Sequence, residues 1–261
     1  MKRVELVLLA ILLPVVGFVV AQVVDRSHVT AASAAAVLEP TSRVAPRRTT
    51  AAKPRAARSG GTSRPSLSAP VRDIDDVRRR LRQGEKGTYI GEVLLQRDSA
   101  LARWPERTVQ PLRVWVSDGS RFQDWDYAYA ERVREAFTEW AANGIPIRFT
   151  FVLDSADADI HVSWINQFNE PISGKTLWAR DRNWWIVSSS ITLALHHNQG
   201  EPLDGESIRA IALHEVGHLL GLDHTTDTGN IMTARVRVRT LSEADRATVR
   251  LLYSLPPGSV K

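Results

Sequence analysis

The 261-residue sequence predicts an α+β fold in its C-terminal part, where strand-like and helix-like stretches follow one another. Residues 111–117 place Leu112, Val114 and Val116 at alternate positions, which is the period of a strand with one buried face. Residues 126–142 instead repeat large apolar side chains every three or four positions, which is the period of an amphipathic helix. These two periods in one stretch predict a compact domain that contains both strands and helices.

The remaining elements can be placed by the same criteria. Four more strands are expected where β-branched and aromatic residues gather, at residues 147–153, 159–165, 175–180 and 184–195. Helices are expected at residues 204–220 and 242–253, and a short charged helix at 73–83. Ser242 is a favourable N-cap, and Asp245 lies in the first turn of the last helix.

The N-terminus reads as an export signal, because Lys2 and Arg3 precede an apolar run from Leu6 to Val24. That run is just long enough to span a bilayer, and small residues suited to cleavage lie well beyond it. We therefore expect residues 1–26 to be a signal anchor in preference to a cleaved signal peptide. The protein should be extracellular or part of the cell envelope, membrane-anchored or secreted.

Residues 27–75 are rich in Ala, Pro and Arg and predict a disordered basic linker. Residues 27–72 carry eight basic side chains and one acidic one, whereas residues 73–261 carry 23 basic and 26 acidic ones. The linker either lies on anionic membrane or wall polymer or is a solvated spacer without a partner. Because the rest of the chain is nearly neutral, we expect no nucleic-acid binding.

The segment from His214 to His224 carries the chemistry. His214 and His218 are four residues apart on an expected helix, so both imidazoles share one face and can reach one metal ion. Glu215 borders that metal without being a ligand. Gly221 allows the helix to end, so that the chain turns back and presents His224 as a third ligand.

Three neutral imidazoles and one open position are typical of catalytic zinc, whereas a structural site has four protein ligands. The chain has no cysteine, which excludes thiolate sites and disulfides. Glu215 is then expected to act as general base toward water and to pass the proton to the leaving amine. Met232 lies eight residues after His224, as expected of a methionine turn beneath the metal.

This stretch resembles the zinc signature and methionine turn of the metzincins, and within them it is similar to the matrixins, the clan of the matrix metalloproteinases. Weaker likenesses flank it, in the strands that begin at Pro111 and Ala158 and in the tail 241–253. The resemblance implies a zincin domain at residues 104–256, after a lead-in segment at 76–103. That domain would hold a twisted mixed β-sheet, two long helices including the active-site helix, and a C-terminal helix after the methionine turn.

The resemblance also implies a zinc-dependent endopeptidase acting on peptide or protein substrates, and we expect a monomer. A substrate would lie extended against an edge strand, for which residues 184–190 are the candidate. By resemblance, residues 233–239 wall the pocket for the substrate residue after the cut bond. Their alternation places valines on one side and arginines on the other, which favours an apolar pocket.

The chain also departs from the family. It lacks the cysteine that blocks zinc in the family's zymogens, and Ala244 replaces one acid of the pair that binds the new N-terminus. A second, structural zinc is not expected from His161, His196 and His197, which read as strand or loop residues. Calcium remains a candidate cofactor, because four aspartates are either oxygen donors or solvated turn residues: Asp154, Asp157, Asp159 and Asp181.

The alternative function is a membrane-tethered envelope binding or adhesion protein with a secondary or vestigial peptidase site. Loss of Glu215 would be the simplest mark of such a protein, and Glu215 is present. The sequence therefore favours the enzyme.

Overall fold

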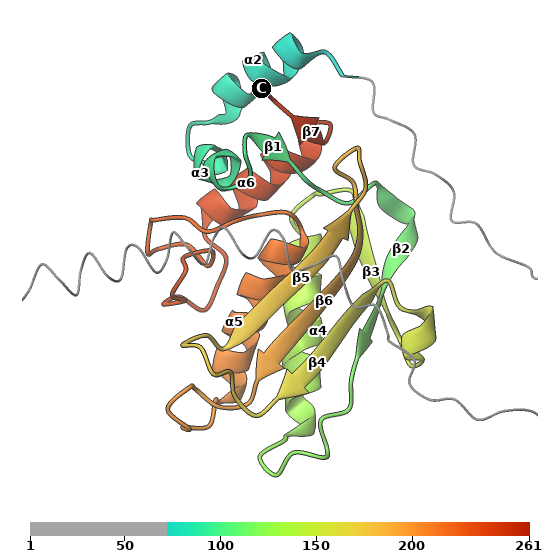
Figure 1. Ribbon diagram of the computed structural model, residues 1–261, viewed down its shortest axis with the longest axis vertical. Helices are drawn as coiled ribbons and strands as arrows, with labels where there is room; N and C mark the ends of the chain where they lie inside the picture. Colours follow the sequence, from blue (N-terminus) through green and yellow to red (C-terminus); the bar gives the residue numbers. More distant parts are fainter. Residues whose placement is uncertain (1–71) are drawn as a thin grey trace, which may run out of the picture. The chain divides into compact units, whose positions relative to one another are not determined.

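The computed structural model describes residues 72–261, coloured in Figure 1. The expected signal anchor and nearly all of the expected linker lie outside these residues. Within residues 72–261, no helix combines the length and the apolar character needed to cross a bilayer.

A five-stranded mixed sheet is the centre of the fold (Figure 1). Its strands are β2 (Arg107–Val116), β3 (Ile147–Val152), β4 (Ile160–Ile165), β5 (Gly174–Arg180) and β6 (Ile186–Ala194), in the order β3-β2-β4-β6-β5. All neighbours are parallel except β5, which is antiparallel to β6. In β4, alternate residues are buried, as the period of a strand with one covered face requires.

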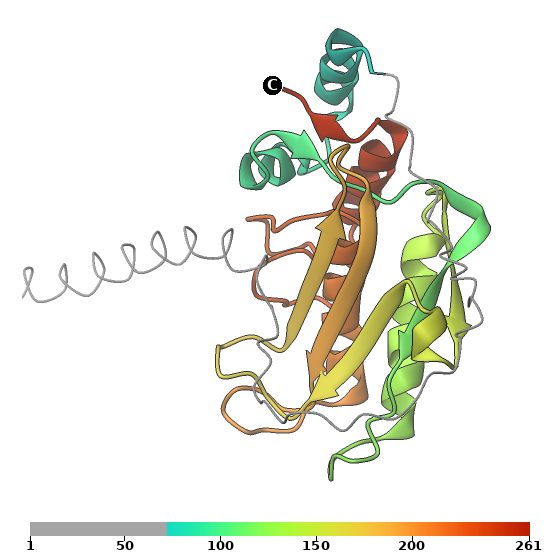
Figure 2. The same cartoon turned by 45° about the vertical axis from the view of Figure 1, so that its right-hand side comes forward.

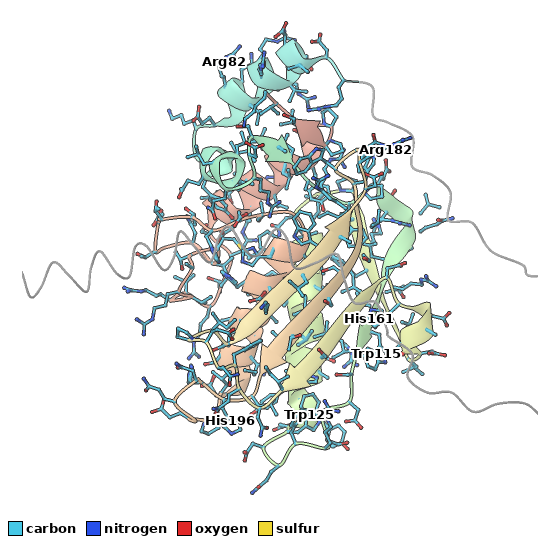
Figure 3. All side chains as sticks on the ribbon, in the orientation of Figure 1. Arg82, Trp115, Trp125, His161, Arg182 and His196 are labelled. Atoms are coloured by element: carbon cyan, nitrogen blue, oxygen red, sulfur yellow. The ribbon has the colours of Figure 1, made fainter. Side chains whose placement is uncertain are left out.

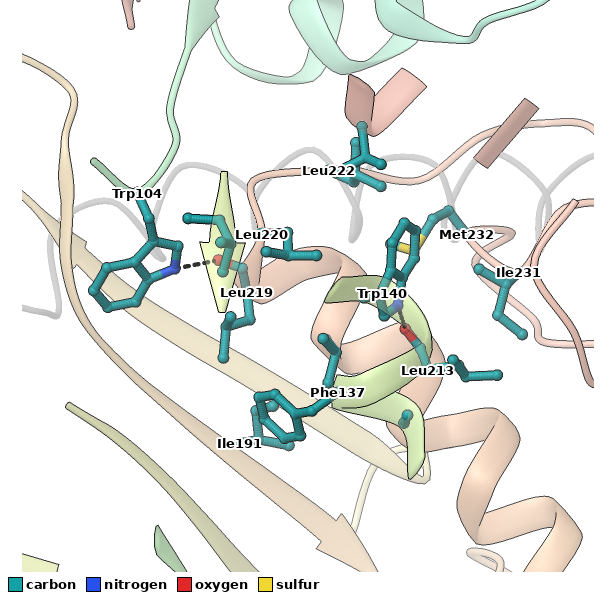
Figure 4. Packing of buried hydrophobic residues seen from close by; sticks show 14 of the residues in the cluster. Trp104, Phe137, Trp140, Ile191, Leu213, Leu219, Leu220, Leu222, Ile231 and Met232 are labelled. Atoms are coloured by element: carbon teal, nitrogen blue, oxygen red, sulfur yellow. Dashed lines mark hydrogen bonds between the residues drawn. The ribbon is translucent and has the colours of Figure 1, made fainter. Parts of the chain in front are cut away.

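Two long helices cover one face of this sheet, α4 (Tyr127–Ala141) and α5 (Gly205–Leu219), as Figures 1 and 2 both show. Each begins at an aspartate whose carboxylate accepts a hydrogen bond from a first-turn amide. The helices also join each other, because the Trp140 indole of α4 donates to the Leu213 carbonyl of α5 over 2.8 Å (Figure 4). The core between sheet and helices therefore fixes the position of α5.

A smaller group of elements lies at one end of the sheet, and both views show it (Figures 1 and 2). It holds α2 (Ile74–Gly84), α3 (Ile90–Gln96), β1 (Ala100–Leu101), α6 (Glu243–Ser254) and β7 (Gly258–Ser259). β1 pairs antiparallel with β7, which joins the lead-in segment to the last residues of the chain. A short 3-10 helix, Ser155–Asp157, follows β3.

The start of α6 connects three parts of this end of the molecule. Ser242 and Asp245 form a capping box, as their spacing predicts. Asp245 is fully buried, and its carboxylate also accepts from the Tyr89 hydroxyl at 2.9 Å and from the Ile231 amide at 2.9 Å. The lead-in segment, the loop before α6 and α6 itself thus share one carboxylate.

The predicted α+β class, the mixed sheet and the two long helices are confirmed. The prediction that residues 184–190 form the exposed edge is wrong. Ser189 of β6 pairs with Ile160 on one side and with Trp178 on the other, so β6 is an inner strand. The edge on this side is β5, because the chain folds back through a hairpin and places the later strand inside.

Candidate metal centre

Helix α5 carries His214, Glu215 and His218 into the interior between the sheet and the smaller end of the domain. The helix is buried on several sides, and His214 and Glu215 are only 6% and 4% exposed. Four residues of helix turn the chain by about 400°, so the two imidazoles point the same way while Glu215 is turned aside. The predicted spacing thus brings both rings to one point.

The third histidine reaches the same point because α5 ends abruptly. Gly221 has a φ of +102°, a left-handed conformation that glycine adopts without strain. A Cβ atom there would also lie 2.1 Å from the Ala102 carbonyl oxygen. Both requirements select glycine, and the chain then turns back toward His218 with His224.

The three Nε2 atoms converge with the spacing that a tetrahedral metal requires. The distance from His218 Nε2 is 3.0 Å to His214 Nε2 and 3.2 Å to His224 Nε2, and the three ligand atoms lie within 4.8 Å of one another. Nitrogens at the zinc distance of about 2.0–2.1 Å on a tetrahedron are about 3.3 Å apart. Among residues 72–261, this is the group of three His, Cys, Asp or Glu side chains that could hold a metal ion.

Backbone carbonyls orient two of the rings. His214 Nδ1 donates to the Ile231 carbonyl over 2.8 Å, and His218 Nδ1 donates to the Leu222 carbonyl over 3.2 Å. With the proton on Nδ1, the Nε2 lone pair faces the other histidines, and two lone pairs at 3.0 Å repel unless a cation lies between them. The donor set therefore fits a zinc ion.

Burial keeps the rings in the form that binds metal. It lowers the pKa of His214 to about 4, and it lowers the pKa of His218 well below its usual value. Burial also lowers the pKa of His224. All three imidazoles are thus neutral near neutral pH, as metal ligands must be.

Glu215 is held by the edge strand. The Thr176 hydroxyl lies 2.6 Å from its Oε2 and 3.0 Å from its backbone carbonyl oxygen. Gly174, two residues away on the same face of β5, leaves space: a Cβ there would lie 2.4 Å from Glu215 Oε1. The pKa of Glu215 is raised to about 7, because the effect of burial outweighs the hydrogen bond from Thr176, which acts in the opposite direction. A base with a pKa near the working pH suits proton transfer.

Met232 packs against α5, and Figure 4 shows it beside the Trp140 ring. It is fully buried, and its Sδ fills the place that a Cβ at Gly217 would occupy, at 2.2 Å. The Met232 carbonyl accepts from the Thr225 amide at 3.0 Å, next to His224. The turn that contains Met232 thus touches both α5 and the segment that presents the third ring.

His161 and His196, which Figure 3 labels, belong to β4 and to the segment after β6. His161 stacks edge-on against Trp115 of the neighbouring strand and contacts the Ser155 carbonyl at 3.0 Å. His196 lies after β6, 3.0 Å from Asp124. These positions agree with the predicted strand and loop.

The four aspartates considered for calcium are engaged by protein groups. Asp157 and Asp159 face the Arg113 guanidinium at 4.0 and 3.2 Å. Asp154 accepts from the Ala156 amide of the 3-10 helix, and Asp181 accepts from two amides of the β5–β6 turn. Each of the four carboxylates thus has at least one protein partner in a turn or an ion pair.

Residues 233–239 have the predicted two sides. Val236 and Val238 are half-buried against the core, whereas Arg235, Arg237 and Arg239 are exposed. An unpaired guanidinium is costly to bury, and this is the reason for the arrangement.

Sequence reasoning missed Thr176 and Gly174. Both lie in the expected strand at 175–180 or beside it, but their contacts with Glu215 span 39 positions from Thr176 and 41 from Gly174, and they are made by tertiary packing. The sequence does show a threonine at position 176 in an expected strand. Its partner can be identified only when the position of that strand next to α5 is known.

Comparisons with known proteins agree with this geometry. Residues 120–254, just over half of the chain, match the family described as Matrixin. Metalloendoproteinase 1 of Glycine max is 30% identical over 91 residues, which are 33% of this chain and 28% of that protein. Metalloendoproteinase 1-MMP of Arabidopsis thaliana is 27% identical over 163 residues, which are 53% of this chain and 42% of the relative.

The chain thus aligns with less than half of the length of either relative. The matched family segment nevertheless includes α4, most of the sheet, all three converging histidines and the last helix. The chain therefore belongs to the matrixin family.

Proposed function

We propose that this protein is a zinc-dependent endopeptidase, in which His214, His218 and His224 hold the metal and Glu215 is the catalytic base. The observation that carries the proposal is the convergence of three neutral imidazole nitrogens beside a buried carboxylate. A zinc ion held there supplies a Lewis acid that polarises a carbonyl and brings the pKa of water close to neutrality.

Glu215 acts as the general base and then as the general acid. Its carboxylate accepts a proton from the attacking water and later gives that proton to the leaving amine. Thr176 holds Oε2 by its hydroxyl, so that Oε1 is the oxygen left for water. Because Glu215 is only 4% exposed and Thr176 binds it, packing and this hydrogen bond hold the carboxylate in one orientation.

We further propose that the substrate lies extended along β5. This strand has a partner on one side only, β6, and its free edge can accept another strand. Leu177, 61% exposed, offers an apolar contact on this strand. The half-buried valines of residues 233–239 support a preference for an apolar residue after the cut bond.

Zinc is the proposed cofactor, and calcium stays a candidate second cofactor through Asp154, Asp157, Asp159 and Asp181. For the whole chain we propose export, an N-terminal anchor in residues 1–26, a linker from residue 27 to the start of α2, and a monomeric state. The apolar run and the composition of those residues support the anchor and the linker.

Protease treatment of intact cells should release the catalytic part from the membrane fraction. A soluble form that starts near Val37 would instead indicate a cleaved signal.

The full-length chain should be incubated with a peptide library, with and without a zinc chelator, and the products sequenced. We expect internal cleavage before apolar residues that stops with the chelator and returns with zinc. Cleavage mainly before Asp or Glu would contradict the apolar pocket. Binding to peptides without any cleavage would favour the alternative of a tethered binding protein.

A further inference from the structure

The segment that presents His224 has no regular secondary structure, and it lies beside α3 in both views (Figures 1 and 2). The rings of His214 and His218 are oriented by hydrogen bonds from their Nδ1 atoms to backbone carbonyls. His224 is held through its backbone instead. Its amide donates to the Asp223 carboxylate over 3.0 Å, and its carbonyl accepts from Gln96 of α3 at 2.6 Å.

Arg97, directly after α3, holds the residues before His224. Its guanidinium donates to the Gly221 carbonyl, to the Leu222 carbonyl over 2.6 Å and to the Asp223 carboxylate over 3.1 Å. The Arg97 side chain is 8% exposed and lies over the Trp178 ring of β5. A buried guanidinium whose donors all meet one short segment fixes the path of that segment.

Glu92 holds the residues after His224. One carboxylate oxygen accepts from the Thr225 hydroxyl at 2.9 Å, and the other accepts from the Thr226 amide at 2.7 Å. Glu92 and Gln96 of α3, together with Arg97 directly after it, therefore hydrogen-bond to residues 221–226 both before and after His224.

Helix α3 is itself anchored, so these contacts have a rigid base. Ile90 and Val93 are buried in the core. Tyr89, its N-cap, donates its amide to the Thr248 hydroxyl and its own hydroxyl to Asp245, both on α6.

We infer that Glu92, Gln96 and Arg97 are positioning residues for the third metal ligand, and that residues 89–97 belong to the metal-binding unit although they precede the family match. This inference rests on the proposed zinc site. In physical terms, α3 holds residues 221–226 in the metal-binding conformation before the metal is bound. Less conformational entropy is then lost when zinc binds.

The first measurement uses the metal-free full-length chain and amide hydrogen exchange at residues 221–226. Arg97→Met should raise exchange there by about 5-fold or more, the factor that corresponds to the loss of one hydrogen bond. The matched control is Arg103→Met. Arg103 is also in the lead-in segment and donates to the Leu255 and Trp104 carbonyls, so its loss should destabilise the fold without touching residues 221–226.

The second measurement is zinc affinity by competition with a chelator. Arg97→Met should weaken zinc binding about 10–100-fold, the usual cost of removing support behind a metal ligand. In case that variant folds poorly, Gln96→Ala provides a mild test, because Gln96 is exposed. It should weaken binding about 5-fold, whereas Leu95→Ala, at the neighbouring 83%-exposed position, should not.

The two proposals fail in different ways. A wild-type chain that binds no zinc would contradict the proposed function. A wild-type chain that binds zinc, together with Arg97→Met and Gln96→Ala variants that keep both its affinity and its exchange rates, would overturn the role of α3.

Discussion

At the scale of single residues, the candidate site combines side chains that were predicted with others that only the fold could identify. The zinc motif is local, because its spacing along one helix determines which side chains meet. His214, Glu215, His218 and His224 were therefore named from the sequence alone. Thr176 was not, because it approaches Glu215 across the sheet.

The first prediction concerns the base. Glu215→Gln keeps the shape of the side chain and removes its basicity, so zinc content should stay at one equivalent while kcat falls by about 10²–10⁴-fold. Metal analysis and steady-state kinetics on the same preparation check both parts. Activity above a tenth of wild type would contradict the role of Glu215.

The second prediction concerns Thr176. Thr176→Val removes the hydroxyl at nearly constant shape, and hydrogen bonds to charged groups contribute about 1.5–3 kcal/mol, so kcat should fall about 10-fold or more. KM and zinc content should not change, because Thr176 is not placed as a ligand. Thr176→Ser restores a hydroxyl and should restore most of kcat. An equal loss in both variants would show that packing, and not the hydrogen bond, is what matters.

At the scale of elements, most predicted boundaries agree with the observed ones within two residues, but β2 begins four residues earlier than predicted, and α3, β1 and β7 were not predicted. The agreement arises because caps and periods are local signals: Asp126, Asp204 and Ser242 start helices where their short polar side chains predict. Strand order is not a local signal. The aromatic stretch after Trp184 reads equally well as an edge or an inner strand, and the error about the edge came from this ambiguity. Its neighbour β5, with Lys175 and Arg180, has the charges typical of an edge.

A third prediction belongs to the start of α6. Asp245→Asn replaces the carboxylate that accepts from Tyr89, Ile231 and Ser242 by an amide whose NH₂ faces donors. The free energy of unfolding should fall by about 3 kcal/mol, as expected for buried donors left without an acceptor. Urea unfolding measures this. Glu243→Gln, on the same turn but exposed, is the control and should leave the midpoint unchanged.

At the scale of the whole molecule, the domain extends further toward the N-terminus than its recognisable motifs. Apart from the short helix at 73–83, the lead-in segment has no signature of its own, so it was predicted only as a segment before the domain. Val77, Leu81, Ile90 and Val93 nevertheless belong to the same buried cluster as the sheet and α5. Long-range packing of this kind has no short sequence pattern, and this is why it escaped prediction.

The fourth prediction concerns removal of metal. A ligand that binds only the folded chain, at 1,000 times its Kd, stabilises it by about 4 kcal/mol, which for a domain of this size is a Tm shift of about 10 °C. A chelator should therefore lower the Tm of the full-length chain by about that amount, and added zinc should restore it. His218→Ala should melt at one temperature with or without chelator. A chelator effect of the same size in that variant would place the stabilising metal elsewhere.

The pairing of β1 with β7 has a consequence for the stability of the metal site. Residues 258–261 hold the lead-in segment by strand pairing, by the bond from Arg78 to the Val260 carbonyl and by the ion pair of Lys261 with Asp98. Loss of these contacts would free β1 and loosen α3 behind the third histidine. The third ligand would then lose its support through a strand pair that includes none of the three histidines.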